Sequence, residues 1–168
     1  MRRILKTIPA TLLAFVTYIV FSGSITLYDI LTGIAVSILI GVITANMLLT
    51  NPLKILDIRR WIWLFAYMLH YFFIDEVKAH IDVIKRIIHP KMPINPGIVK
   101  VPINVSTDYA LTAVANSITN TPGTVVVDVD KEKGYLYIHW IDVKTIEPNE
   151  AWKQISQVFE KFAKKVFD

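Results

Sequence analysis

The distribution of hydrophobic positions divides the chain into three consecutive parts. Two apolar stretches, residues 7–28 and 30–53, carry no charged side chain and are separated only by Asp29. Each is long enough to cross a hydrocarbon core as a helix, which takes about 20 residues. A Ser-Gly-Ser sequence shortly before Asp29 supplies a turn, and we expect Asp29 to be the N-cap of the second helix. Residues 1–53 are therefore predicted to form a transmembrane helical hairpin, in preference to a cleaved leader.

The third apolar run, residues 61–74, has only 14 residues and covers about 21 Å as a helix, short of the roughly 30 Å of a hydrocarbon core. Its continuation is amphipathic, with tryptophan and tyrosine at the start of the run, where the headgroup boundary favours them. We predict one helix over 59–89, and assign 54–89 to the membrane interface, lying flat or entering obliquely. A third full span is the alternative, and it would place the rest of the chain outside. The predicted apolar stripe is Phe73, Val77, Ile81, Ile84 and Ile88.

Beyond His89-Pro90, the pattern changes to short alternating segments separated by turns. Residues 98–103, 125–129 and 135–141 read as strands, and a helix begins at Ser106 or Thr107 and runs to about residue 119. A closing helix is predicted over 149–167. Residues 90–168 are therefore expected to form a cytoplasmic domain, a small α+β sandwich of order β-α-β-β-α with its sheet covered by helices. The sequence Thr121-Pro122-Gly123-Thr124 predicts a turn between the helix that ends near residue 119 and the strand of residues 125–129.

The closing helix has the clearest amphipathic pattern in the chain. Its apolar stripe is predicted to consist of Trp152, Ile155, Phe159, Phe162 and Val166. The polar side chains assigned to the opposite, solvated face are Lys153, Gln157, Glu160, Lys164 and Lys165.

The location of charge changes the meaning of the net charge of +4. Residues 1–60 hold six basic and two acidic side chains, whereas residues 90–168 hold nine of each. All six basic residues flank the hairpin and none lies in its turn, so the positive-inside rule predicts that both hairpin ends are cytoplasmic. The excess of basic residues thus indicates membrane orientation, and nucleic acid is not expected as a partner. The six are Arg2, Arg3, Lys6, Lys54, Arg59 and Arg60.

Composition excludes several classes of protein. Apolar residues make up 54% of the chain and mean hydropathy is +0.47, which argues against disorder. With no cysteine, the chain has no disulfide framework, cysteine-ligated metal or thiol nucleophile. The four histidines lack zinc-binding spacing, and no phosphate loop or nucleophile elbow occurs. We therefore expect no cofactor, no metal and no catalytic site.

Ionisable residues inside a membrane are the groups that could carry ions. His70 is the only titratable residue singled out within an apolar run, and Asp29 lies at the hairpin turn. His70 could relay protons, but a hydrogen-bonded histidine against a neighbouring subunit is favoured. Asp29 is favoured as a cap over an ion ligand. The pair Glu76 and His80 is interpreted as a surface pair.

Other residue groups have structural interpretations that outweigh functional ones. Asp128 and Asp130 suit a solvated hairpin end better than a catalytic pair, and the turn at 121–124 needs no ligand. Tyr135, Tyr137 and His139 share one strand face, where core packing and a contact surface are favoured over stacking with nucleotides. Small residues of the second span are expected to allow close helix contacts: Gly33, Ala35, Ser37, Gly41 and Ala45.

Several motifs together resemble one protein family. They are Asp82-Val83-Ile84 with Pro90-Lys91-Met92, Asn95-Pro96-Gly97-Ile98-Val99, Ala115-Asn116-Ser117-Ile118-Thr119, Thr121-Pro122-Gly123-Thr124 and Tyr137-Ile138-His139-Trp140-Ile141-Asp142-Val143. In order and spacing the chain resembles the E subunit of the Mrp-type multisubunit monovalent cation/proton antiporters over nearly its whole length.

The resemblance implies a non-catalytic, accessory subunit in an antiporter that exchanges sodium or another monovalent cation for protons. It implies other Mrp-type subunits and the lipid bilayer as partners. It also implies a second possible host, because similar subunits occur in archaeal membrane-bound hydrogenases and sulfur reductases. An interpretation from a different class, a free-standing membrane-tethered binding module, predicts a stable monomer after gentle extraction.

Overall fold

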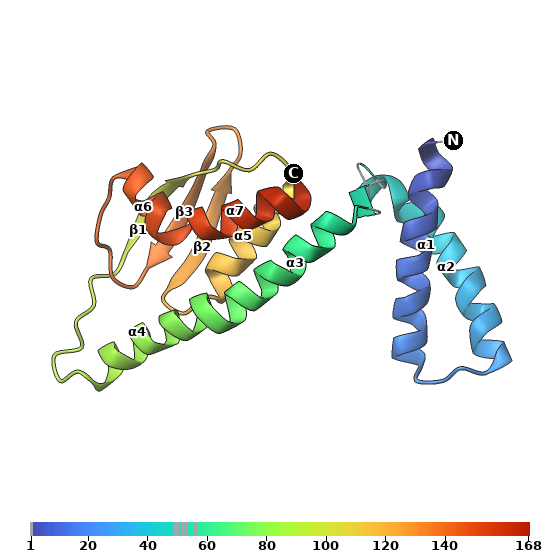
Figure 1. Cartoon of the computed structure of the whole chain (residues 1–168), viewed down its shortest axis with the longest axis horizontal. Helices are drawn as coiled ribbons and strands as arrows, with labels where there is room; N and C mark the ends of the chain where they lie inside the picture. The colour runs from blue at the N-terminus through green and yellow to red at the C-terminus, as the bar shows by residue number, and fades with distance from the viewer. Residues whose placement is uncertain (1, 49–50, 52–53, 56) are drawn as a thin grey trace. The chain divides into compact units, whose positions relative to one another are not determined.

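The computed structural model describes residues 2–48, 51, 54–55 and 57–168 of the chain (Figure 1). The chain divides into two compact units, Met1–Asp57 and Ile58–Asp168, which are described separately. The predicted end of the second apolar run, at residue 53, lies outside the described residues.

The first unit is a helical hairpin of α1 (Arg2–Ser22) and α2 (Leu27–Leu48), which contact one another along their length. Gly23 in the turn has a φ of +66°, a conformation that glycine adopts without strain. By length and composition, one stretch of the described residues qualifies as a membrane span, Leu27–Ala45, and Lys6–Ser22 is a shorter apolar helix.

Small residues on α2 form the hairpin seam. Gly33, Ser37, Gly41 and Ala45 recur every fourth residue and are all buried. A Cβ atom at Gly41 would lie 2.0 Å from Thr11 Oγ1, so the two helices approach too closely there for any side chain. Four of the five small residues therefore allow the expected close helix contact, and they make it with α1 inside the hairpin. Ala35, the fifth, is exposed.

The start of α2 corrects the assignment of Asp29 as the N-cap. Thr26 Oγ1 accepts a hydrogen bond from the Asp29 N–H at 3.3 Å, and Asp29 Oδ2 accepts one from the Thr26 N–H at 3.1 Å. This reciprocal arrangement is a capping box with Thr26 as the N-cap and Asp29 three residues later. The N-cap is therefore Thr26, three residues before Asp29, which was the expected N-cap.

The second unit begins with one continuous helix, as the sequence predicts. It consists of α3 (Ile58–His70), a π-helical turn η2 (Tyr71–Asp75) and α4 (Glu76–Ile88). The π turn inserts one extra residue into the helical repeat, a feature frequent at functional sites. It shifts the helical phase so that Tyr67 before the turn, Tyr71 at its first position, and Val83 and Arg86 after it all face the domain.

The sheet has three antiparallel strands in the order β1-β3-β2: β1 (Gly97–Pro102), β2 (Thr124–Asp130) and β3 (Tyr135–Trp140). The register shifts between Val126 and Asp128, which marks a β-bulge. Helix α5 (Asp108–Asn120) joins β1 to β2, and the Thr107 hydroxyl accepts from Ala110 N–H as its N-cap. The Thr121–Thr124 turn is closed by a 3.3 Å hydrogen bond from Thr124 N–H to Thr121 O.

The predicted single closing helix is two helices, α6 (Pro148–Ile155) and α7 (Gln157–Phe167), separated at the buried Ser156. The break lets α6 pack on β1 while α7 packs on α5 and α3. The observed order is therefore β-α-β-β-α-α. A straight helix would have kept one stripe toward one neighbour, and the periodicity alone does not reveal the change of direction.

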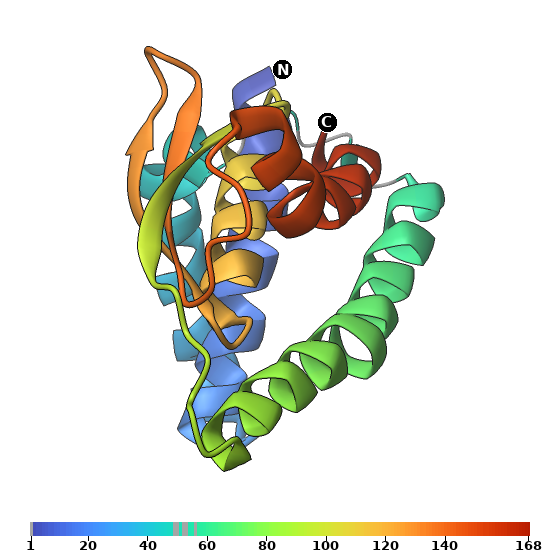
Figure 2. The ribbon, with the colours of Figure 1, turned by 90° about the vertical axis from the view of Figure 1, so that its left-hand side faces the viewer.

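The core lies between the sheet and the helices on one side of it. Val101, Val114, Ile118, Leu136 and Ile138 have no exposed surface. Figure 2 shows helices α5, α6 and α7 on the same side of the strands. The sheet is thus covered by helices on one face, as expected, and on the opposite face Ile98 and Val125 are exposed.

Candidate functional sites

Helix α3 is held against the domain by aromatic packing on α7. The buried Tyr67 ring stacks on Phe162 with centroids 5.3 Å apart and an interplanar angle of 0°. The Tyr67 hydroxyl also forms a hydrogen bond with Ser117 Oγ on α5, and burial raises its pKa to about 12. Arg60 donates from its guanidinium to Val166 O at 2.7 Å. These contacts make the long helix part of the domain.

The π turn brings titratable side chains together. His70 Nε2 lies 3.5 Å from Asp75 Oδ2, an oxygen that has no hydrogen-bond partner within the part of the chain described. Burial raises the pKa of Asp75, and His70 opposes that shift. Glu76 accepts a 2.5 Å hydrogen bond from the Tyr71 hydroxyl and lies 3.2 Å from His80 Nδ1.

These two histidine–carboxylate pairs belong to the second unit, where His70 also packs on Phe162 at 5.1 Å. His70 therefore occupies the boundary between the long helix and α7. Across the described residues, no group of three or more metal-ligating side chains comes together. The titratable side chains of the π turn therefore form two separate pairs, His70 with Asp75 and Glu76 with His80.

Asp29, the other sequence candidate, lies at the turn of the hairpin. In addition to the bonds of the capping box, Asp29 Oδ2 accepts from Ser24 Oγ at 2.7 Å and from Thr26 Oγ1 at 2.5 Å. This oxygen is thus occupied by donors of its own turn.

The remaining candidates have local partners. Asp130 accepts hydrogen bonds from the backbone N–H and the ammonium group of Lys133, both at 2.9 Å, within the β2–β3 turn. On the open sheet face, Lys100 Nζ lies 3.8 Å from the centre of the Tyr135 ring.

Two charged residues have structural roles that the sequence did not reveal. Glu160, assigned to the polar face, is 1% exposed and accepts from Asn104 N–H at 3.2 Å and from Trp152 Nε1 at 2.7 Å. Arg86 joins α4 to two loops, by donating to Pro93 O and by pairing with Asp142 at 3.0 Å, and it also donates to Asp82 within α4. The spacing of Asp82 and Arg86, one helical turn apart, was the only visible signal.

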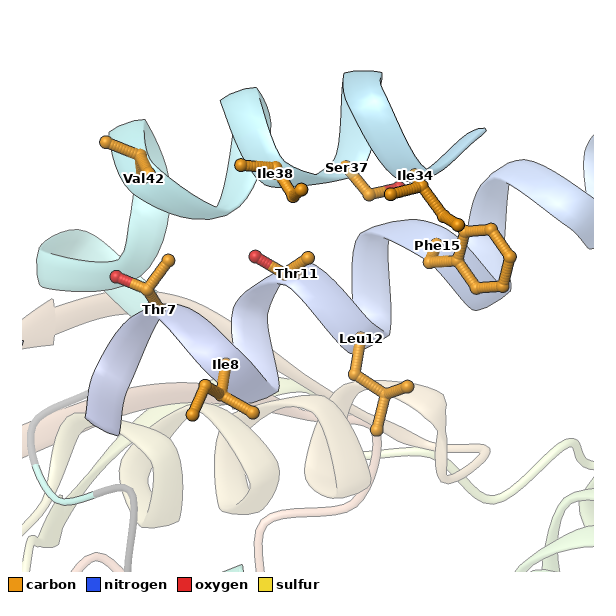
Figure 3. A pocket seen from close by; sticks show the side chains of 9 residues that line it. All are labelled: Thr7, Ile8, Thr11, Leu12, Phe15, Ile34, Ser37, Ile38 and Val42. Carbon is orange, nitrogen blue, oxygen red and sulfur yellow. The ribbon is translucent and has the colours of Figure 1, made fainter. Parts of the chain in front are cut away.

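A groove of about 630 Å³ runs between α1 and α2 (Figure 3). It is lined almost entirely by apolar side chains, apart from the hydroxyl groups of Thr7, Thr11 and Ser37. The Ser37 hydroxyl is buried and has no hydrogen-bond partner among the described residues. Without a charged group, the groove offers packing surface and no acid–base chemistry.

A continuous exposed apolar surface lies along the long helix. From residue 61 to residue 74 every exposed side chain is hydrophobic, and the stripe continues onto α4 through Val77, Ile81, Ile84 and Ile88, which are 46–75% exposed. A soluble protein rarely exposes a continuous apolar surface of this extent. The exposed residues of α3 and the π turn that form this surface, named here the outer face, are Ile58, Trp61, Ile62, Phe65, Met68, Leu69, Phe72 and Phe73.

An apolar hairpin, a long helix with an exposed apolar side and a small α+β domain are together typical of a membrane-associated protein. The chain belongs to the Na+/H+ ion antiporter subunit family, whose model matches residues 11–166.

Individual relatives are similar in sequence to this chain over most of their length. The chain is 36% identical over 153 residues to the E subunit of the Na(+)/H(+) antiporter of Alkalihalophilus pseudofirmus, covering 91% of this chain and 90% of that protein. It is 32% identical to the E1 subunit of the Na(+)/H(+) antiporter of Staphylococcus haemolyticus, covering 92% of both. Among solved structures, a chain of the membrane-bound sulfane sulfur reductase, an archaeal respiratory membrane complex, matches with a TM-score of 0.81 and 32% identity. That match covers 96% of this chain and 99% of the other.

Proposed function

We propose that this protein is a non-catalytic accessory and assembly subunit of a multisubunit monovalent cation/proton antiporter module. The family match over residues 11–166 carries the proposal. The absence of charged residues from the sequence of both apolar stretches supports it, because an ion path through a membrane needs such groups. The ions then pass through partner subunits, and this chain holds them together or positions them.

We further propose that residues 1–53 span the membrane twice, that 54–89 lie at the interface, and that the domain of residues 90–168 is cytoplasmic. Six basic residues flank the hairpin and none lies in its turn. A full third span would also carry Asp75 and Glu76 toward the far boundary, with the charged turns of α4 outside.

Cysteine labelling tests this topology, because the chain has no native cysteine. In intact cells, an impermeant thiol reagent should react with Ser22→Cys in the hairpin turn and leave Lys131→Cys in the β2–β3 turn unreacted. Permeabilised cells provide the control, in which Lys131→Cys must react. Reaction of Lys131→Cys in sealed cells would establish an external domain and three spans.

A second candidate host is a respiratory complex that contains a similar module. The observation favouring it is the 32% identity to a chain of the sulfane sulfur reductase complex over almost its full length. Affinity purification of the tagged full chain in mild detergent, with identification of the bound proteins, separates the possibilities. Antiporter subunits alone support the first host, and added redox subunits support the second. A stable monomer would show a free-standing membrane module and contradict both.

A further inference from the structure

Positively charged side chains lie on the two helices that adjoin the apolar outer face. Helix α3 contains two arginines and no acidic residue, and its side toward the domain packs on α7. Helix α7 contains three lysines, Lys161, Lys164 and Lys165, and one acid, Glu160, which is buried. The exposed charges of these two helices are therefore all positive, although residues 90–168 as a whole hold equal numbers of basic and acidic side chains.

A direct contact places Lys165 beside α3. Lys165 Nζ lies 3.4 Å from the centre of the Trp63 ring, and Trp63 lies 6.4 Å from Phe162 between centroids. Figure 1 shows α7 beside α3. Lys165 thus lies against one side of α3, Lys161 and Lys164 are exposed on the same helix α7, and the outer face presents hydrophobic side chains on the other side of α3.

We propose that the outer face of α3 and the π turn enters an anionic lipid surface, with Lys161, Lys164 and Lys165 binding the lipid phosphates. The proposal rests on the membrane placement of residues 54–89 and names the lipid that this surface recognises. The hydrophobic side chains reach the acyl boundary, and the lysines remain at the headgroup level, where Trp61 and Trp63 are also favoured.

Charge complementarity favours lipid over a partner protein. Anionic headgroups attract juxtamembrane lysines, and each such lysine changes the affinity by about fivefold. Between residues 61 and 74 every exposed side chain is hydrophobic, whereas protein surfaces that recognise partners usually combine an apolar centre with hydrogen-bonding groups around it. The acyl chains of a lipid require no hydrogen-bonding groups around the apolar surface.

Spin labelling of the full chain tests the apolar part. A nitroxide on Phe65→Cys is compared with one on Lys131→Cys after reconstitution in vesicles of phosphatidylcholine mixed with phosphatidylglycerol. We expect oxygen, which concentrates in acyl chains, to relax the label at position 65, and a water-soluble nickel chelate to relax the label at position 131. Strong relaxation of position 65 by nickel would overturn the proposal. So would shielding of position 65 from both reagents in the assembled complex, because a protein would then cover the face.

The lysines are tested by lipid preference. The variant K161Q/K164Q/K165Q is compared with K100Q/K131Q/K133Q, which removes the same charge from the sheet and its hairpin. The first should lose on the order of a hundredfold in preference for phosphatidylglycerol over phosphatidylcholine, measured as lipids retained by the full chain, and the second should lose little. Equal losses would overturn the headgroup assignment. The lipid-preference measurement uses the full chain without partner subunits. A negative result there is therefore distinguishable from failure of the proposed accessory role, which is tested by co-purification of the partner subunits.

Discussion

Single charged residues in the domain act as structural connectors. Glu160 is buried between the segment after β1 and α6, where Asn104 N–H and Trp152 Nε1 donate to its carboxylate. A buried charge is tolerated only where donors surround it. The carboxylate therefore fixes α7 relative to α6 at the point where the helix breaks.

Glu160→Ala should lower the free energy of unfolding of the domain by about 2–4 kcal/mol, because it removes a buried carboxylate that accepts from both Asn104 N–H and Trp152 Nε1. Glu150→Ala, at an exposed position that pairs with Lys153, should cost less than about 1 kcal/mol. Denaturant unfolding of the full chain in detergent, followed by tryptophan fluorescence, measures both. Equal losses would contradict the structural role of Glu160.

The stability of the second unit should depend on pH through Asp75, because the folded state favours the protonated form of its carboxyl group. Burial raises its pKa in the folded chain above the ordinary value near 3.9, with Glu76 adding to the shift and His70 and Lys78 opposing it. The folded state therefore binds this proton more readily than the unfolded state, and stability is lost as pH rises from that ordinary value through the folded pKa. Asp75→Asn should stabilise the α3–α4 region at neutral pH, and the difference should vanish below about pH 3.9.

Hydrogen exchange of amides 70–80 at the two pH values measures this difference. Lys78 and His70 lie close enough to Asp75 to affect its titration, so the variant and the wild type are compared at the same ionic strength. A variant less stable than the wild type at neutral pH would contradict the effect of burial on Asp75.

At the scale of elements, the hairpin depends on its small-residue seam. Close approach of α1 and α2 allows the contacts and the interhelical hydrogen bond between Tyr18 and Thr32, 3.0 Å long, to form in an apolar environment.

Gly41→Leu should separate the helices, since even a Cβ atom at this position would overlap Thr11. Ala35→Leu is the matched control, because Ala35 is exposed and lies outside the seam. We expect Gly41→Leu to abolish, and Ala35→Leu to preserve, disulfide formation between cysteines introduced at Thr11 and at Ser37. Persistent cross-linking in Gly41→Leu would show that the seam is not required.

The sequence predicted most elements, because each has a strong period or turn signal. The hairpin, the long helix, the three strands and the Thr107 cap follow from apolar spacing, charge and turn residues. The π turn and the break at Ser156 were not predictable, because a one-residue insertion and a change of direction leave the apolar period almost intact. Glu160 was misplaced for the same reason: on a straight helix it falls on the polar side.

For the candidate site, the sequence located the residues but not their partners. His70 and Asp75 are five residues apart, a spacing that the π turn uses and an ordinary helix does not. The exposed lysines of α7 look like an ordinary polar face unless α3 is known to pack beside them. The capping box of Thr26 and Asp29 was readable in principle, because acceptor residues three apart at a helix start are its signature.

At the scale of the whole molecule, the central claim is that this chain supports an antiporter without conducting ions. The two titratable candidates have local partners: Asp29 completes a helix cap, and His70 pairs with Asp75 beside α7. Neither arrangement requires a transported ion.

Antiport by membrane vesicles carrying the assembled complex tests this claim most directly. The vesicles are prepared from cells in which His70→Ala or Asp29→Asn replaces the native chain, and assembly is checked by co-purification of the partner subunits. We predict that sodium addition still collapses the pH gradient in both variants, because the ions pass through other subunits. Complete loss of antiport in a normally assembled complex, from either substitution, would place this chain in the conduction path and contradict the account.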